Sequence, residues 1–308
     1  MKVFVTGVNG QLGHDVMLEL VKRGYEAIGS GSGDVYSGND EVAALPYVSL
    51  DITDMDAVRL VIGTIKPDAV IHCSAWTAVD AAEEPENFQK VTALNVKGPE
   101  NIAKACKKIG AKLIYLSTDY VFSGEGNTPW KPDDRCFAPL NVYGESKLAG
   151  EFAVSENTDR FFIVRIAWVF GLNGKNFIKT MINVGKKHPQ VRVVNDQIGT
   201  PTYTKDLARL LVDMIETEKY GYYHATNSES NPGEYISWAD LAEESYHAAG
   251  MDVTVNRVST VEYGLSVAAR PFNSRLDKSK LEKVGFKPLP DWRDAVARYV
   301  VEAGLKAE

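Results

Sequence analysis

Tyr143 and Lys147 are the two residues of this sequence whose types and spacing best suit acid–base chemistry. They stand four residues apart in a predicted helix, which places both side chains on one face, about 6 Å apart at Cβ. A free phenol has a pKa near 10, and a neighbouring ammonium favours its ionised form, which brings proton exchange closer to neutral pH. Among the 14 tyrosines only Tyr143 has a lysine at this distance, although a chance surface pair would have the same spacing.

A second chemical signal precedes this helix in the chain. The apolar run 112–117 is a predicted strand, and it ends in Ser117, Thr118 and Asp119. A hydroxyl at the carboxyl end of such a strand is able to polarise a substrate carbonyl. The alternative is that Ser117 and Thr118 are ordinary hydroxyls at a strand edge.

The first strand of the chain, residues 3–5, leads into a turn with glycine at positions 7, 10 and 13 and then into a helix. Glycines in such a turn let backbone N–H groups approach a pyrophosphate, which the helix dipole then favours. A turn of this kind also needs glycine for positive φ alone. Its place between the first strand and the first helix favours the prediction of a dinucleotide site.

The end of the second strand bears on which dinucleotide is bound. An NAD site places a carboxylate there for the ribose 2′-OH, whereas this chain has Gly29, Ser30, Gly31 and Ser32. Without that carboxylate a 2′-phosphate is tolerated, and Ser30 or Ser32 could bond to it. The sequence therefore favours NADPH over NADH, although no arginine stands at this point.

Two further segments fall where a cofactor would pass. Asp51, at the end of the third strand, could accept a hydrogen bond from the adenine amine, or could pair with the start of a helix near Asp54. Residues 73–77, at the end of the fourth strand, are mostly small. They would let the backbone pass beneath a cofactor, or let a helix pack closely on the sheet.

The elements that must position these residues alternate along the first 165 residues. The predicted strands cover 3–5, 25–28, 47–50, 69–73, 112–117 and 161–166, and the predicted helices cover 11–22, 54–65, 85–109 and 141–155. The helix over 85–109 either runs through or breaks near Gly98 and Pro99. Repeated βα units predict an α/β fold with a doubly wound parallel sheet of the Rossmann type. After Gly171 the alternation stops. We expect a dinucleotide-binding domain over 1–171 and a smaller mixed α/β substrate domain over 172–308, with a soft boundary and segments able to interchange.

The composition excludes several classes of protein. The 308 residues carry a net charge of −7 with no basic run, which argues against nucleic acid as a partner. No apolar stretch has the length of a membrane span, and no signal peptide is evident. Cys73, Cys106 and Cys136 form no disulfide or zinc pattern, and no metal is predicted. We expect a cytoplasmic protein with reduced cysteines.

With the glycine turn, Thr118 and the Tyr143–Lys147 pair in this order, the chain resembles an extended short-chain dehydrogenase/reductase. It further resembles the dTDP-4-dehydrorhamnose reductases in five strings that occur in order: TDYVF (118–122), NVYGESK (141–147), RIAWVFG (165–171), DQIGTPT (196–202) and RPFNSRLD (270–277). This likeness implies that NADPH or NADH reduces the 4-keto group of a nucleotide sugar, dTDP-4-dehydro-L-rhamnose, to give dTDP-L-rhamnose for polysaccharide biosynthesis.

The resemblance also implies roles for individual residues. Tyr143 would donate the proton, Lys147 would hold the nicotinamide ribose and lower the pKa of the phenol, and Thr118 would bond the sugar carbonyl. The implied substrate contacts are Thr118, Asp119, Tyr143, Trp168, Asn176 and Arg270, with Phe177 beside Asn176. Together with the residues found above, the expected cofactor contacts are Gly7, Gly10, Gln11, Leu12, Gly13, Ser30, Asp51, Ile52, Ser74, Ala75, Trp76, Thr77, Tyr143 and Lys147.

The sequence departs from the family pattern in a few places. The family commonly has histidine where Trp76 stands and an acidic residue after the second strand, and the loop 29–46 is longer than usual. Some members dimerise through magnesium held by glutamates. Asp15 stands near one such position, but no metal follows from it, and a homodimer remains an open expectation.

Two alternatives remain. One is another nucleotide-sugar 4-keto reductase or an epimerase of this fold. The other is a non-catalytic regulatory homologue, which would be expected to have lost part of the set Thr118, Tyr143 and Lys147.

Overall fold

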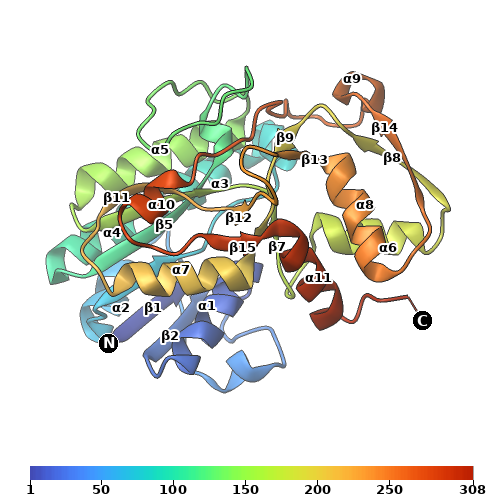
Figure 1. The fold of residues 1–308 in the computed structure, drawn as a ribbon. Coiled ribbons are helices and arrows are strands. Elements are labelled where there is room, and N and C mark those ends of the chain that lie inside the picture. The colour runs from blue at the N-terminus through green and yellow to red at the C-terminus, as the bar shows by residue number, and fades with distance from the viewer. Residues whose placement is uncertain (308) are drawn as a thin grey trace.

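A sheet of seven parallel strands lies at the centre of the computed structural model, which describes residues 1–307 (Figure 1). In spatial order its strands are β11 (Gly221–His224), β6 (Phe161–Ile166), β5 (Lys112–Thr118), β4 (Ala69–His72), β1 (Lys2–Thr6), β2 (Glu26–Gly31) and β3 (Tyr47–Ser49). The order reverses beside β1, so the predicted doubly wound α/β fold is confirmed. The central strands are nearly continuous apolar runs because both faces of the sheet are covered.

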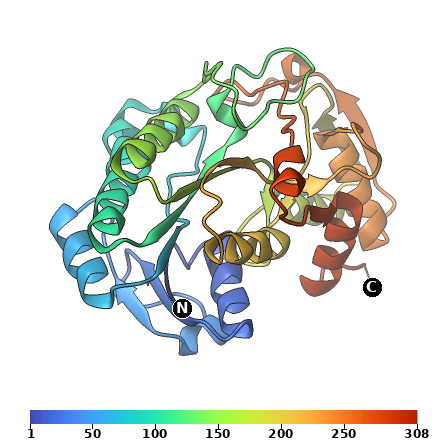
Figure 2. The same ribbon diagram turned by 60° about the vertical axis from the view of Figure 1, so that its left-hand side comes forward.

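Helices cover the sheet on both sides, as Figure 2 shows. The helices of one face are α1 (Gln11–Lys22) and α7 (Thr204–Ile215), and those of the other are α2 (Met55–Ile65), α4 (Gly98–Ile109) and α5 (Val142–Asn157). The predicted bounds of α1 are those observed. The helical segment predicted over 85–109 contains α3 (Phe88–Thr92), a π-helical turn (Ala93–Lys97) and α4, and α4 begins at Gly98, where a break was the alternative.

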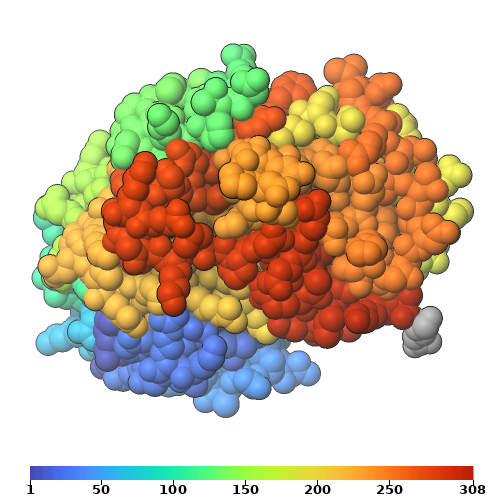
Figure 3. Space-filling view, viewed as in Figure 1, coloured from blue at the N-terminus to red at the C-terminus, as the bar shows by residue number. Residues whose placement is uncertain are grey.

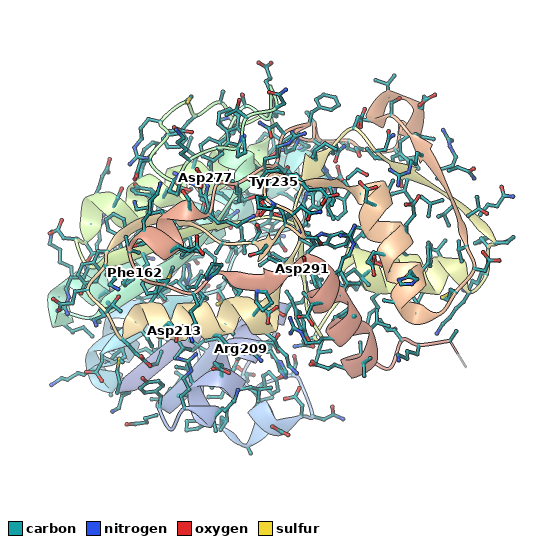
Figure 4. The ribbon with its side chains drawn as sticks, in the orientation of Figure 1. Phe162, Arg209, Asp213, Tyr235, Asp277 and Asp291 are labelled. Carbon is teal, nitrogen blue, oxygen red and sulfur yellow. The ribbon has the colours of Figure 1, made fainter. Side chains whose placement is uncertain are left out.

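The second half of the chain contributes to both regions. Helix α7 packs beside α1, where the Arg23 guanidinium bonds the Asp213 carboxylate and the Arg209 carbonyl oxygen, residues labelled on α7 in Figure 4. Strand β11 then pairs with β6 at the edge of the central sheet. Two elements that follow residue 171 in the chain therefore pack in the sheet region, and the division into two functional domains near residue 171 stays a prediction.

A smaller region with its own core stands beside the sheet. Its main helices are α6 (Phe177–Gly185), α8 (Trp238–Ala249) and α11 (Trp292–Glu302), and its longest strand pair is β8 (Gln190–Val194) with β14 (Thr254–Val258). The space-filling view shows the C-terminal part of the chain extending over both regions (Figure 3). None of the helices within residues 1–307 is long and apolar enough to span a bilayer.

Short pairs of strands connect this region to the central one. They are β7 (Val169–Phe170) with β10 (Thr202–Tyr203), β9 (Ile198–Gly199) with β13 (Ile236–Ser237), and β12 (Asn227–Ser228) with β15 (Leu289–Asp291). Shorter helical turns, α9 (Thr260–Tyr263) and α10 (Ser279–Lys283), lie in the C-terminal part. Residues from both regions therefore meet beyond the carboxyl ends of β1, β4, β5 and β6, where an open α/β sheet binds its ligands.

Candidate active site

The glycine turn after β1 has the geometry of a pyrophosphate cradle. Gly7 has a φ of +73°, and a Cβ on it would lie 2.7 Å from the backbone nitrogen of Ser74. A Cβ on Gly13 would lie 2.3 Å from the Gly7 carbonyl oxygen, so only glycine lets α1 start this close to the turn. Gly10 caps α1 without a side-chain bond, which leaves the first helical N–H groups, including those of Gln11 and Leu12, free of intrahelical partners. Such a terminus fits a dinucleotide diphosphate.

The loop before α6 lies directly against this turn. The Asn173 amide donates to the Asn9 carbonyl oxygen at 3.1 Å, and the Asn176 amide donates to Gln11 Oε1 at 3.1 Å. Asn176 also caps α6 by accepting from the Lys179 N–H, and it bonds the Tyr299 hydroxyl. The expected substrate residue Asn176 is therefore occupied in joining the two regions, and its diphosphate contact stays a prediction.

The end of β2 extends further than the sequence suggested. Gly29, Ser30 and Gly31 were expected to begin a loop, but they pair with β3 and, in part, with β1, and so belong to the strand. Ser30 is fully buried and its Oγ is without a hydrogen-bond partner in the described chain. Asn9 Oδ1 accepts from the N–H and hydroxyl of Ser37, which folds the long loop 29–46 back onto the glycine turn.

Asp51 and Ile52 have different environments. The Asp51 carboxylate is exposed and accepts from the N–H and hydroxyl of Thr53. Asp54 caps α2 by accepting from two first-turn N–H groups, and Asp51 meets the start of the helix only through its carbonyl oxygen, which accepts from the Asp54 N–H at 3.2 Å. Ile52 is packed in the core, and its carbonyl oxygen accepts from the Asn101 amide.

A residue that the sequence did not single out supports the segment 73–77. Asn95, fully buried in the π-helical turn, accepts from the Trp76 N–H and donates to the Trp76 carbonyl oxygen and to Ser146 Oγ. It thereby ties the segment that includes Ala75 and Trp76 to α5, while Thr77 is exposed. π-Helical turns are frequent at functional sites, but an asparagine inside a helix is only a weak sequence signal.

Thr118, Asp119 and Tyr143 come together at the carboxyl end of β5. The Thr118 hydroxyl donates to Asp119 Oδ1 at 3.0 Å. Burial raises the pKa of the Tyr143 phenol, and a hydrogen bond with Thr118 opposes part of that rise. The Tyr143 ring meets the edge of Tyr120 with centroids 5.7 Å apart. Asp119 is buried and its Oδ2 lacks a partner within residues 1–307, so that this oxygen is able to accept from a ligand hydroxyl.

The electrostatics of these groups differ from the expectation for Tyr143. Burial, and then the Asp119 carboxylate, raise the pKa of Tyr143 above its usual value, and the effect expected from Lys147 is absent. Burial lowers the pKa of Lys147 to about 7, and its ammonium lies over the Tyr115 ring, 4.2 Å from the centroid. Burial also raises the pKa of Asp119 to about 6. The phenol is therefore protonated at neutral pH, as a proton donor must be.

The remaining expected substrate residues come from the smaller region and its connections. Trp168 has a φ of +52° and stacks on Trp238 at 4.0 Å between centroids. Arg270 donates to Asp80 Oδ2 at 2.8 Å. Burial raises the pKa of Tyr120, and the Arg270 charge opposes part of that rise, which places this charge near the Tyr120–Tyr143 pair. Arg270 is thus near the site but paired with a carboxylate.

Comparisons with known proteins agree with this arrangement. Residues 1–304 match the family model described as RmlD substrate binding domain. A dTDP-4-dehydrorhamnose reductase of Streptomyces griseus is 39% identical over 298 residues, covering 95% of this chain and 90% of that protein. A probable dTDP-4,6-dihydroxy-2-methyloxan-3-one 4-ketoreductase of Streptomyces antibioticus is 35% identical, covering 96% and 93%. The crystal structure of the Bacillus anthracis dTDP-4-dehydrorhamnose reductase with NADP has a TM-score of 0.86 and 38% identity, covering 98% and 100%.

Proposed function

Because the chain belongs to the family of the RmlD substrate-binding domain, we propose that it reduces the 4-keto group of dTDP-4-dehydro-L-rhamnose to dTDP-L-rhamnose with NAD(P)H. It is an oxidoreductase of dTDP-rhamnose and polysaccharide biosynthesis. The observation that carries the proposal is that Thr118 ends β5 and that Tyr143 and Lys147 stand on α5, while the glycine turn follows β1 at the same carboxyl edge of the parallel sheet. The intact set argues against a non-catalytic homologue.

The cofactor is held along the carboxyl edge of the central sheet. The glycine turn and the first N–H groups of α1 hold the diphosphate, Lys147 holds the nicotinamide ribose, and the segment 73–77 supports the middle of the cofactor. Bound NAD(P)H supplies the hydride that adds to C4 of the sugar. NADPH is preferred, because β2 ends in Ser30 and Gly31 without a carboxylate that would repel a 2′-phosphate.

The protein's own groups complete the reduction. As C4 becomes tetrahedral, its oxygen takes the proton of the Tyr143 hydroxyl, which burial keeps protonated. Thr118 donates a hydrogen bond to the same oxygen by turning its hydroxyl away from Asp119. Asp119 Oδ2 accepts from a sugar hydroxyl. Trp168 contacts the sugar, and Arg270 binds the substrate diphosphate once it leaves Asp80.

Residues 1–171 together with α7 and β11 form the cofactor-binding domain, and the rest of 172–308 binds the nucleotide sugar. We place the enzyme in the cytoplasm, where the free thiols of Cys73, Cys106 and Cys136 remain reduced. A homodimer is part of the same proposal, and light scattering on the purified protein tests it.

The deciding experiment supplies purified protein with NADPH and follows loss of the reduced cofactor's absorbance. Oxidation is expected only when dTDP-4-dehydrorhamnose is added, with dTDP-glucose as the matched control that lacks the keto group. Turnover of a different 4-keto sugar nucleotide, but not of this one, would refute the substrate and favour the activity named for the Streptomyces antibioticus relative. A kcat/KM for NADPH well below that for NADH would refute the cofactor preference.

A further inference from the structure

An ion pair outside the expected site is completely buried beneath α5. Arg165 of β6 and Glu151 of α5 are both 0% exposed. The guanidinium donates from Nε to Glu151 Oε1 and from Nη2 to Oε2, each at 2.8 Å. The Ser117 hydroxyl donates to the same Oε1 at 2.5 Å, which connects the pair to the end of β5 immediately before Thr118.

The surroundings hold the arginine in one place. Its carbon Cζ lies 5.0 Å from the ring centroid of Phe122, 5.1 Å from that of Tyr222 and 5.4 Å from that of Phe137. Its Nη1 donates to the Pro132 carbonyl oxygen. His224 Nε2 lies 3.3 Å from the same Nη1. A buried ion pair is often replaceable by apolar side chains without loss of stability, so stability alone is a weak explanation for it.

The pair acts on Lys147 because Glu151 follows Lys147 by one helical turn on the same face of α5. Lys147 is itself buried, and its ammonium has the Tyr115 ring as a neighbour and no hydrogen bond to any acceptor within residues 1–307. The other titratable groups near it are His72 of β4, Cys73 immediately after that strand, and Tyr143 one helical turn earlier in α5.

These other groups are uncharged at neutral pH. Burial lowers the pKa of His72 to about 3 and raises the pKa of Cys73 to about 12. The pKa of Tyr143 is also raised by burial. Glu151 is therefore the negative charge that opposes the loss of the proton from Lys147, against the dominant effect of burial.

We propose that Glu151, fixed by Arg165 and Ser117, is a positioning residue that keeps the Lys147 ammonium charged and directed at the nicotinamide ribose. The inference rests on the proposed cofactor role of Lys147. It assigns Arg165 a purpose beyond joining α5 to β6, because the bidentate pair fixes the Glu151 carboxylate one helical turn from Lys147.

The test measures the Kd of NADPH at pH 6 and pH 8 by quenching of protein fluorescence, in the full chain. The double variant Glu151→Gln/Arg165→Met removes both charges together, so that no unpaired charge is buried. An opposite charge at this range shifts a pKa by about 1 unit or more, and Lys147 starts near 7. A fall of 1 unit weakens binding about tenfold at pH 8 and about twofold at pH 6.

Matched variants separate the outcomes. Ser117→Ala loosens the carboxylate without removing a charge and is expected to weaken binding about twofold at pH 8. The exposed pair Arg257–Glu243, as Arg257→Met/Glu243→Gln, is the control and should bind as the wild type does at both pH values. The inference would be overturned if the double variant bound NADPH with wild-type affinity, or if its affinity fell equally at both pH values. If the double variant does not fold, unchanged NADPH affinity in Ser117→Ala would overturn the inference instead. Lys147→Met with wild-type affinity would instead refute the cofactor role of Lys147.

Discussion

Replacing Tyr143 by phenylalanine removes the hydroxyl that donates the proton while keeping the ring and its edge contact with Tyr120. Because the ring stays, we expect the melting temperature and the Kd of NADPH to change little. General acid catalysis contributes about 10²- to 10⁴-fold, so kcat for the reduction should fall by at least ~100-fold, or about 3 kcal/mol in the barrier. Loss of NADPH absorbance under saturating substrate measures this directly.

The pH dependence of the same reaction tests the assignment further. Burial raises the pKa of Tyr143, so the donor stays protonated between pH 7 and pH 9. A fall of the wild-type rate in this range is expected to follow the deprotonation of Lys147, whose pKa is about 7, and not that of the phenol. Tyr120→Phe, which removes a hydroxyl from the neighbouring ring, is the matched control and should retain kcat within a few-fold. Turnover of Tyr143→Phe near the wild-type rate would show that the proton comes from another group.

Further predictions concern Asp119 and the glycines. The pKa of Asp119 is raised to about 6 from 3.8, so the folded protein binds this proton more tightly than the unfolded chain, and stability falls as pH rises through about 4 to 6. Asp119→Asn should therefore raise the melting temperature at pH 7.5 by a few degrees, with no gain at pH 4, and lower kcat/KM; an unchanged melting temperature at pH 7.5 contradicts this. Gly13→Ala should abolish NADPH binding in titrations, because its Cβ meets the Gly7 carbonyl oxygen, while Gly10→Ala, at 3.3 Å, should weaken it less. In α2, a Cβ added at Gly63 would have no atom within 4 Å. Gly63→Ala should therefore raise the free energy of unfolding by up to about 1 kcal/mol, as measured by denaturant titration.

Much of the fold follows from local sequence because its central strands are buried on both faces and read as apolar runs. The glycine turn and Gly24 bound α1 on either side, which explains why its predicted limits agree with the structure. The return of α7 and β11 to the sheet was not predictable, because it depends on pairing between β11 and β6, which no local pattern encodes. The extra strand residues Gly29 to Gly31 depend in the same way on the register with β3.

Those parts of the candidate site could be predicted whose residues stand at a regular spacing in one helix or at the end of a strand. The helical period placed Tyr143 and Lys147 together, and strand ends placed Thr118 near them. The charge states were not predictable, because burial dominates them and burial is a property of the assembled protein. Asn95 and Glu151 were not predictable for a related reason, because each contacts a residue that is distant in sequence. Asn95 bonds Trp76, and Glu151 pairs with Arg165.

The distribution of charge now has a physical explanation. A chain of net charge −7 that binds two polyanionic ligands must supply positive potential locally. Three cations in and around the site are restrained: Arg165 is neutralised by Glu151, Arg270 is held by Asp80, and Lys147 loses its proton near pH 7. The backbone N–H groups at the start of α1 carry no net charge, so they need no carboxylate partner that would neutralise them. We therefore expect the backbone N–H groups to bind the cofactor diphosphate at every pH, and the cations to contribute only when a ligand displaces their partners or restores their protons.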